Sequence, residues 1–389
     1  MTLSRRHPRK ADVLHHPSAA RRFNARRSFL TTLAAFGTAL LMQPLAASET
    51  AAFELSGEPR MAFIYAATAR DGGWNEALDN ARMAVEGELG VSIPTVESIP
   101  EEATALRNAI DLLIRRGVNV IVGTTYGYSE GILEAARDYP DVAFVNASGA
   151  TNHDNLEGFY VRSYEAWYLA GMAAAATSEV GRIGILGGFP VGVVNWDINA
   201  FALGAQAIDP DIEVIAVFTN SWWDPVREGA VTRAMLDQGA DVIANNLSSS
   251  APFSAAEEAG ARSIGFQLDM SEYAPNGHLT SVIFNWDQHL LPTLAALAEG
   301  SWEPNPFGAF PSMADGVVAL TPVSDLVPEE VRARIDETAE AIMSGAFSPF
   351  DGPIHAQDGR VVVPEGERLD DAGLWGMDFL VRGVTGTLN

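Results

Sequence analysis

The chain has 389 residues, of which 47% are hydrophobic and 19% charged, with a formal net charge of −25 and no cysteine. This composition is typical of a well-packed protein of two domains, and it excludes a disordered chain, disulfides, thiolate metal sites and a lipoprotein anchored through cysteine. The acidic excess argues against nucleic acid and anionic lipid as partners, because phosphates are bound by Lys and Arg.

The first 48 residues differ from the rest of the chain. They hold eight basic residues and one acidic residue, and they end in an apolar run at 28–48 that is too short, and too rich in Thr and Gly, to span a membrane comfortably. The small residues at 46–48 predict an export signal over 1–48, cleaved near that point, and a mature protein free in the periplasm. "ARRSFLT" at 25–31 resembles the twin-arginine signal of proteins exported already folded, and an Arg-rich Sec signal is the alternative.

Without residues 1–48, the chain keeps 17 basic and 49 acidic residues, no lysine, and a formal net charge of −32. Self-repulsion of this size destabilises a compact state in dilute buffer and is screened by salt. We interpret the charge as adaptation to a saline exterior. A base-composition bias that replaces Lys by Arg explains the missing lysines but not the surplus of acids.

After residue 58, short β-branched runs alternate with stretches of helical spacing. The apolar run that begins at Met61 is a predicted strand, and the helix after it places Leu78 and Val85 on one face. Such alternation predicts a parallel sheet with helices on both faces. The expected further strands are 91–97, 118–123, 141–146, 261–266 and 279–285, and the expected helices are 74–89, 101–116, 128–138 and 287–300.

A very apolar stretch at 164–181 has the hydropathy of a membrane segment. Its two acidic residues, Glu165 and Glu179, bracket only 13 residues. A span of the hydrocarbon core needs about 20 apolar residues, so we expect a buried packing helix.

The pattern repeats at a spacing of 122 residues. Gly117 and Gly239 both follow a helix end and precede a buried strand, and the same shift places Trp74 on Trp196. A repeat without gaps predicts two similar α/β lobes. The Pro- and Gly-rich stretch at 303–316 is the expected connection between them. We expect residues 58–162 plus 287–312 in the first lobe and 163–286 plus 313–389 in the second.

The loops after the predicted strands gather aromatic and amide side chains. In open parallel sheets, ligands bind beyond the carboxyl ends of the strands, so these loops should line a cleft between the lobes. Rings that stack on a flat molecule, with amides and carboxylates at its rim, suit a planar small ligand. The loops are "DGGWN" (71–75), "TTYGYS" (124–129), "NASG" (146–149), "GFPVG" (188–192), "TNSWWDP" (219–225), "NLSSS" (246–250), "QLDM" (267–270) and "NWD" (285–287).

Motifs for catalysis are weak. "GYSEG" at 127–131 matches the nucleophile elbow of α/β hydrolases, but Ser129 comes about six residues after the strand instead of at its end. His278, His289 and His355 are candidate bases without a distinctive context. No histidine spacing indicates a metal, and no glycine-rich loop with the spacing or lysine of a phosphate cradle is present, so we expect neither a metal nor a cofactor.

Seven motifs, in order across nearly all of 58–389, resemble the basic membrane protein family of ABC-transporter solute-binding proteins, of the purine nucleoside receptor type. They are "DGGWN", "TTYGY", "NLEGFYVRSYEAWYLAGMAA", "SWWDP", "DQGADVIA", "LDMSEYAPNGHLTSVIFNWD" and "DGVVALTP". The resemblance implies a type I periplasmic-binding-protein fold, made of two Rossmann-like lobes with parallel sheets and a ligand in the cleft between them. It also implies a non-enzymatic protein that delivers a purine nucleoside or base to a membrane permease.

The resemblance also implies roles for single residues. One aromatic residue from each lobe sandwiches the purine: Trp74 takes the first position, and Trp222 and Phe189 are candidates for the second. Asp269 matches a late Asp that bonds the edge of the base or the ribose. Further candidates for ligand binding are Asn75, Tyr126 and Glu165.

The mature chain departs from the family in lacking a lysine near the ribose. Either Asn285 fills that role, or the ribose is bound loosely and the ligand is a free base. By the internal repeat, Trp196 is a further candidate for ligand contact, with a plain core residue as its alternative, and the alternative for Trp74 is a hydrophobic plug of its helix. The rival function is a secreted α/β hydrolase that uses Ser129.

Overall fold

The structure is a computed structural model that describes residues 53–388. Its first sheet is entirely parallel, and four of its five strands are completely buried runs, as expected where helices cover both faces. In spatial order its strands are β2 (Thr95–Val96), β1 (Met61–Ile64), β3 (Val120–Gly123), β4 (Ala143–Ala147) and β5 (Leu156–Phe159).

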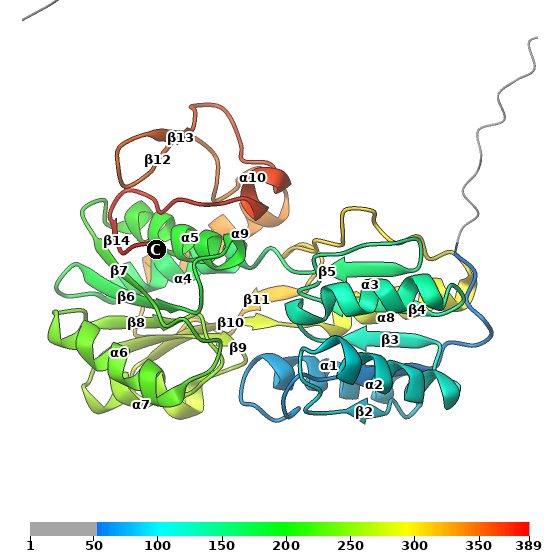
Figure 1. Cartoon of the computed structure of the whole chain (residues 1–389). Helices are drawn as coiled ribbons and strands as arrows, with labels where there is room; N and C mark the ends of the chain where they lie inside the picture. The colour runs from blue at the N-terminus through cyan, green and yellow to red at the C-terminus, as the bar shows by residue number, and fades with distance from the viewer. Residues whose placement is uncertain (1–52, 389) are drawn as a thin grey trace, which may run out of the picture. The chain divides into compact units, whose positions relative to one another are not determined.

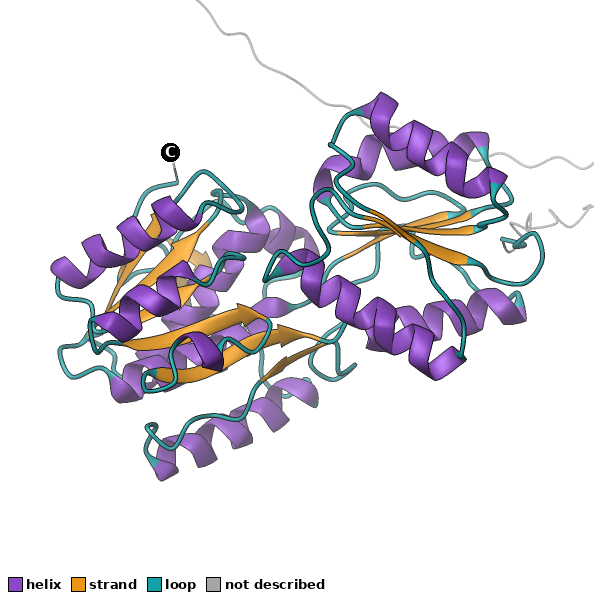
Figure 2. Cartoon of the chain, turned by 90° about the horizontal axis from the view of Figure 1, so that it is seen from below, coloured by secondary structure: helices purple, strands orange, loops and turns teal. Residues whose placement is uncertain are grey.

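The second sheet has seven strands and is parallel except for its edge strand β11, which runs antiparallel to β10. Figure 2 shows both sheets with helices on their two faces. In spatial order the strands are β11 (Val318–Leu320), β10 (His278–Phe284), β9 (Arg262–Gln267), β8 (Val242–Asn245), β6 (Arg182–Gly187), β7 (Glu213–Phe218) and β14 (Val384–Thr385).

The two sheets have the same strand order. Numbered by sequence within each lobe, both run 2-1-3-4-5, as β2-β1-β3-β4-β5 and as β7-β6-β8-β9-β10. Strands β3 and β8 begin at Val120 and Val242, at the predicted spacing of 122 residues. The repeat in the sequence therefore corresponds to two doubly wound lobes, and the predicted α/β fold is confirmed.

The helices of the two lobes follow the same alternation. The first lobe contains α1 (Trp74–Leu89), α2 (Ala103–Arg115), the 3-10 helix η1 (Tyr126–Tyr128) and α3 (Ser129–Asp138). The second contains α4 (Ser163–Thr177), α5 (Gly192–Ile208), α6 (Pro225–Asp237), α7 (Ala251–Glu258), the 3-10 helix η2 (Ser271–Tyr273) and α9 (Glu329–Met343).

The chain crosses between the sheets more than once. Strand β5 of the first sheet leads through Tyr160–Arg162 into α4, and β10 of the second leads into α8 (Asp287–Glu299), which packs against α1. Residues 303–316 then return to β11, and on the way Ala309 pairs with Phe159 beside β5. The return segment therefore lies beside β5 at Ala309 and continues into β11, which pairs with β10 (Figure 1).

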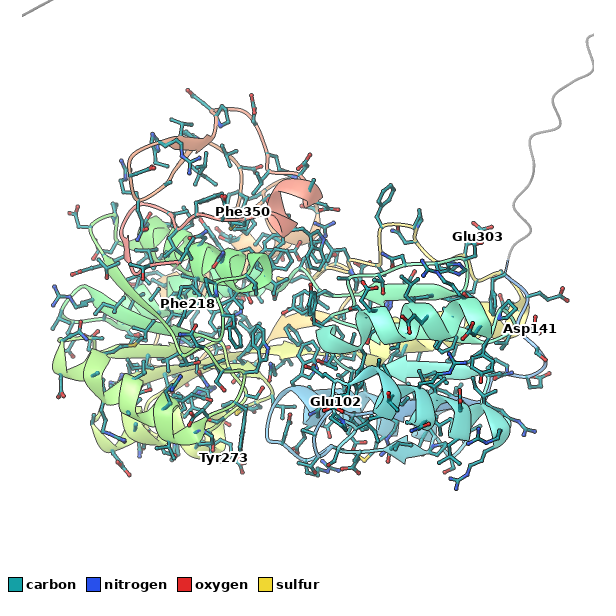
Figure 3. The ribbon with its side chains drawn as sticks, viewed as in Figure 1. Glu102, Asp141, Phe218, Tyr273, Glu303 and Phe350 are labelled. Carbon is teal, nitrogen blue, oxygen red and sulfur yellow. The ribbon has the colours of Figure 1, made fainter. Side chains whose placement is uncertain are left out.

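The C-terminal segment covers the outer side of α5 (Figure 1). It contains β12 (Ile354–His355), β13 (Val361–Val363), α10 (Asp371–Trp375) and β14, which extends the second sheet beside β7. Asn199 of α5 holds this segment by donating to the Phe379 carbonyl and accepting from the Val381 amide. The fully buried Phe350 lies against Tyr164 of α4, with 5.3 Å between ring centroids (Figure 3).

Most expected elements are confirmed within a few residues. The helix predicted over 74–89 is α1, and the expected packing helix is α4, of which 13 of 15 residues are buried. The strand expected over 91–97 is only the two residues of β2. β2 is the edge strand of the sheet and pairs with β1 alone, so few of the residues at 91–97 form backbone pairs with another strand. No helix among residues 53–388 is long and apolar enough to cross a membrane.

Candidate functional site

The residues at the carboxyl ends of the strands meet where the two lobes approach each other. From the first lobe come the turn before α1 and Thr124 after β3. From the second come the loop after β8 and Gln267 at the end of β9. A carbon atom placed as Cβ on Gly73 would lie 2.5 Å from Ser248 Cβ and 2.7 Å from Gln267 Oε1, so the loops of the two lobes are in direct contact.

Trp74 is half-buried at the first position of α1. Its indole Nε1 donates to the carbonyl oxygen of Thr124 at 2.6 Å. Its ring stacks with that of Tyr160, with 6.1 Å between centroids and 18° between planes. The rings of Phe284 and Trp286 lie nearly perpendicular to it, with 6.3 and 5.4 Å between centroids. The indole is thus fixed in orientation at the junction of the lobes, between the turn before α1 and the end of β10.

The turn before α1 is organised by Asp71. One carboxylate oxygen accepts from the backbone N–H groups of Gly73 and Glu76, and the other accepts from the backbone N–H and the side-chain amide of Asn75. These bonds satisfy amides that the first helical turn leaves free. The buried Asn75 is therefore held beside Trp74, and its Oδ1 lies 3.5 Å from the hydroxyl of Thr124.

A buried polar group lies behind the aromatic residues of the second lobe. Asp197 of α5 is 1% exposed and accepts from the Ser163 hydroxyl at 2.6 Å and from the Asn246 side-chain amide at 2.8 Å. Burial raises the pKa of Asp197 to about 8, against the lowering by its hydrogen bonds. Asp197 thereby joins the start of α4 to the loop after β8. Asp197 belongs to none of the predicted loops, although it follows Trp196 directly in "NWD".

The second-lobe aromatic candidates lie together. Phe189 follows β6 and Trp222 follows β7, and their ring centroids are 4.9 Å apart at 61°. Trp222 is 52% exposed and lies over Gly188, where an added Cβ would come within 2.6 Å of the indole. The pair therefore presents a largely open aromatic surface at the mouth of the second lobe.

The acidic and amide candidates are spread over several elements. Asp269 is exposed after β9, with Oδ1 accepting from the Ser271 amide at 3.0 Å. Asn285 is half-buried and donates to the Gly316 carbonyl. Glu165 is buried at the start of α4, where Oε2 accepts from the Met313 amide and burial raises the pKa of Glu165 to about 7. Asn285 and Glu165 thus both contact the returning segment 303–316.

Two aromatic candidates have contrasting environments. Trp196 is 0% exposed and donates from Nε1 to Ser163 at 3.1 Å, among Tyr160, Tyr164 and Trp375. These buried surroundings are those expected if Trp196 is a core residue, which was the alternative to ligand contact. Tyr126 is 65% exposed in η1 after β3.

Ser129 is placed as a structural residue. It is 6% exposed, donates to the Tyr126 carbonyl at 2.6 Å and accepts from the Ala150 amide at 3.0 Å. His278 instead bonds Ser281, and His289 lies beside Glu157. A nucleophilic serine needs a base within hydrogen-bond reach, so this arrangement gives the hydrolase alternative no support.

A hollow of about 500 Å³ lies elsewhere, at the amino-terminal ends of the first sheet's strands. Met61 of β1, Val118 before β3 and Leu294 of α8 are among its lining residues. Parallel sheets bind ligands at the opposite, carboxyl ends. The loops around Trp74 and Ser248 are therefore the candidate site, and this hollow is not.

Comparisons with known proteins identify the family of the chain. Residues 59–348 match the model of a family described as ABC transporter substrate-binding protein, PnrA-like. A purine-binding protein of Brucella abortus is 35% identical over 327 residues, covering 84% of this chain and 92% of that protein. The chain belongs to this family.

Two further proteins are similar to this chain. A putative ABC transporter glucose-binding protein of Haloferax volcanii is 33% identical over 294 residues, covering 75% of this chain and 74% of that protein. The solved structure of an ABC transporter solute-binding protein from Conexibacter woesei has a TM-score of 0.62 at 22% identity, covering 75% of this chain and 98% of that chain. The latter similarity shows the shared two-lobed fold. The PnrA-like family is described as one of substrate-binding proteins of ABC transporters.

Proposed function

We propose that this PnrA-like protein captures a purine base or nucleoside between its two lobes and delivers it to the membrane permease of an ABC importer. The observation that supports it most is the indole of Trp74, fixed at the junction of the lobes by its bond to Thr124. A flat ring held in this way is the surface on which a base stacks. The purine-binding relative is the second support.

In the proposed complex, the purine lies between the lobes, with Trp74 on one side and Trp222 or Phe189 on the other. Asn75, Asp269 and Asn285 provide hydrogen-bonding groups for the rim of the base or the ribose, and Tyr126 adds an exposed ring. Glu165 lies at the start of α4, where the chain crosses from the first lobe to the second, and acts from this crossing. The two lobes rotate relative to each other as they close on the ligand. The first lobe is residues 58–162 plus 287–312, and the second is residues 163–286 plus 313–389. Binding of this kind involves no chemical step.

The test is a thermal-shift screen with adenine, hypoxanthine, adenosine, inosine and guanosine, followed by calorimetry. A ligand at about 100 times its dissociation constant adds about 2.7 kcal/mol to the stability of the folded state. We expect at least one purine to raise the melting temperature. The absence of a shift with every purine would contradict the proposal.

A sugar is the second candidate, because the relative from Haloferax volcanii is described as a putative glucose-binding protein. The same screen therefore includes glucose and ribose, with amino acids as the negative set. A shift with glucose and none with purines would assign the site to sugars.

We further propose that the mature protein acts in the periplasm after twin-arginine export and cleavage near 46–48, positions that lie outside the described residues. The sequence contains no cysteine that could carry the lipid of a lipoprotein. Replacement of Arg26 and Arg27 by Lys should leave precursor in the cytoplasm. Normal export of this double variant would indicate the Sec route.

A further inference from the structure

The contact between the turn before α1 and the loop after β8 is unusually close. A Cβ on Gly73 would lie 2.5 Å from Ser248 Cβ, 2.7 Å from Ser248 Cα and 2.7 Å from Gln267 Oε1. Contacts this short do not occur between real side-chain and backbone atoms, so the position accepts no side chain while the lobes keep this distance. The two glycines of "DGGWN" therefore do not leave free space beside Trp74, because the second lobe fills it.

The second-lobe side of this contact is rigid. Ser248 is 7% exposed and donates from its hydroxyl to Gln267 Oε1 at 3.1 Å. Just before it, the Asn245 side chain donates to the carbonyl oxygens of Leu247 and Ser249. The loop is thus fixed by its own hydrogen bonds, and these would have to break for it to move aside.

Gln267 adds a second observation. Its φ is +72°, in the left-handed region that residues with a side chain rarely adopt. Such strain persists only where the surroundings enforce it. Here the strained residue places its carboxamide, 5% exposed, against Ser248 and Gly73.

The first-lobe side of the contact is equally fixed. The Gly73 amide donates to Asp71 Oδ1 at 2.9 Å, and the Gly73 carbonyl accepts from Ala77 as the first bond of α1. Trp74 is the next residue. Any displacement of Gly73 from the second lobe therefore also displaces the indole from its place at the junction.

We propose that Gly73, seated against Ser248 and Gln267, is the contact that lets the lobes close on the ligand, and that the absence of a side chain at this position determines ligand affinity. Gly73 is a positioning residue and makes no contact with the ligand itself. The inference rests on the proposed function for the ligand used in its test, but the contact is a property of the protein alone.

The first test is Gly73→Ala, with Gly87→Ala as the matched control. Gly87 lies on the exposed face of the same helix, and a Cβ there would meet nothing within 4 Å. We expect Gly73→Ala to weaken binding of the best purine from the screen by about 5- to 150-fold, the factor that an overpacked contact costs. Gly87→Ala should bind like the wild type. Wild-type affinity in Gly73→Ala would overturn the proposal.

A second readout needs no ligand. The chain has no cysteine, so spin labels at Glu134→Cys on α3 and Asp237→Cys on α6, both exposed, report the distance between the lobes without background labelling. Gly73→Ala should shift this distance distribution away from that of the wild type, and Gly87→Ala should not. An unchanged distribution would contradict the contact, whereas a shift together with no purine binding by the wild type would contradict only the purine assignment.

A variant on the other lobe guards against a simple folding defect. Ser248→Leu adds bulk from the opposite side of the same contact, and it should also weaken binding and shift the interlobe distance. If Gly73→Ala lowers the melting temperature of the free protein strongly while Ser248→Leu binds and closes normally, Gly73 serves the first lobe alone and the proposal is wrong.

Discussion

The indole Nε1 of Trp74 and the carbonyl oxygen of Thr124 are 2.6 Å apart and form a hydrogen bond between the start of α1 and the loop after β3. This bond connects two neighbouring strand-end loops of the first lobe. It fixes the plane of the indole against Tyr160. A ring prepared in this way loses little conformational freedom when a flat ligand stacks on it.

For Trp74 we expect the aromatic ring to matter more than the hydrogen bond. Trp74→Phe should keep most of the affinity, whereas Trp74→Ala should lose about 1–3 kcal/mol of binding free energy, as when base-stacking aromatics are truncated. Calorimetry measures both. Because the ring is only half-buried, the free protein should lose less than the roughly 3–5 kcal/mol of a fully buried Trp. A full-sized stability loss with unaltered affinity would make Trp74 a plug of the first lobe.

The contribution of Trp222 to ligand binding can be tested with the neighbouring Trp223 as the control. Trp222→Ala should weaken ligand binding by about 1–3 kcal/mol, and Trp223→Ala, whose residue is 57% exposed, should not. Gly188→Ala should act like Trp222→Ala, since the added Cβ would displace the indole above it. Equal affinities of all three variants and the wild type would remove this ring from the site.

Asp269 is exposed, so its loss should leave the free protein stable. In the complex, a charge-assisted hydrogen bond would be lost and its donor left unpaired, at a cost of about 1–3 kcal/mol of affinity in Asp269→Ala. Glu272→Ala, a nearby exposed acidic residue in η2, is the control. If the two variants bind alike, the effect of Asp269 is only one of local charge.

Asp197 should make stability depend on pH. Its pKa is raised to about 8 in the folded state, against about 3.9 in the unfolded chain, so its contribution is complete below about pH 4 and is lost as the pH rises towards 8. Asn at this position does not titrate. Urea unfolding should therefore show Asp197→Asn gaining stability relative to the wild type between pH 5 and pH 8. A constant difference would mean that Asp197 is already ionised at pH 5.

The formal net charge of −32 that the chain has without residues 1–48 predicts a response to salt. The melting temperature should rise between low ionic strength and molar NaCl, because the Debye length falls to about 3 Å at 1 M and repulsion between the carboxylates is screened. KCl at the same ionic strength should act alike. A flat or falling curve would leave the acidic composition without this explanation.

The candidate site was only partly accessible from the sequence. The loops after the strands were predictable, and they include Gly73, Asn246, Ser248 and Gln267. Their order along the chain does not say which of them touch. The repeat that relates Trp74 to Trp196 also does not say that Trp196 is completely buried, since α5 is covered by the C-terminal segment and α1 is not.

The sequence by itself determined the α/β alternation, the two similar lobes and the family, because these follow from local periodicity, a fixed spacing and ordered motifs. Only the tertiary structure decided that Gly73 meets Ser248 and that Trp74 lies against Tyr160. It also decided that the buried Asp197 of α5 connects α4 to the loop after β8. Each of these is a contact between residues distant in the chain. Their distances depend on how closely the lobes approach and on which helix faces are covered, and no local pattern encodes either.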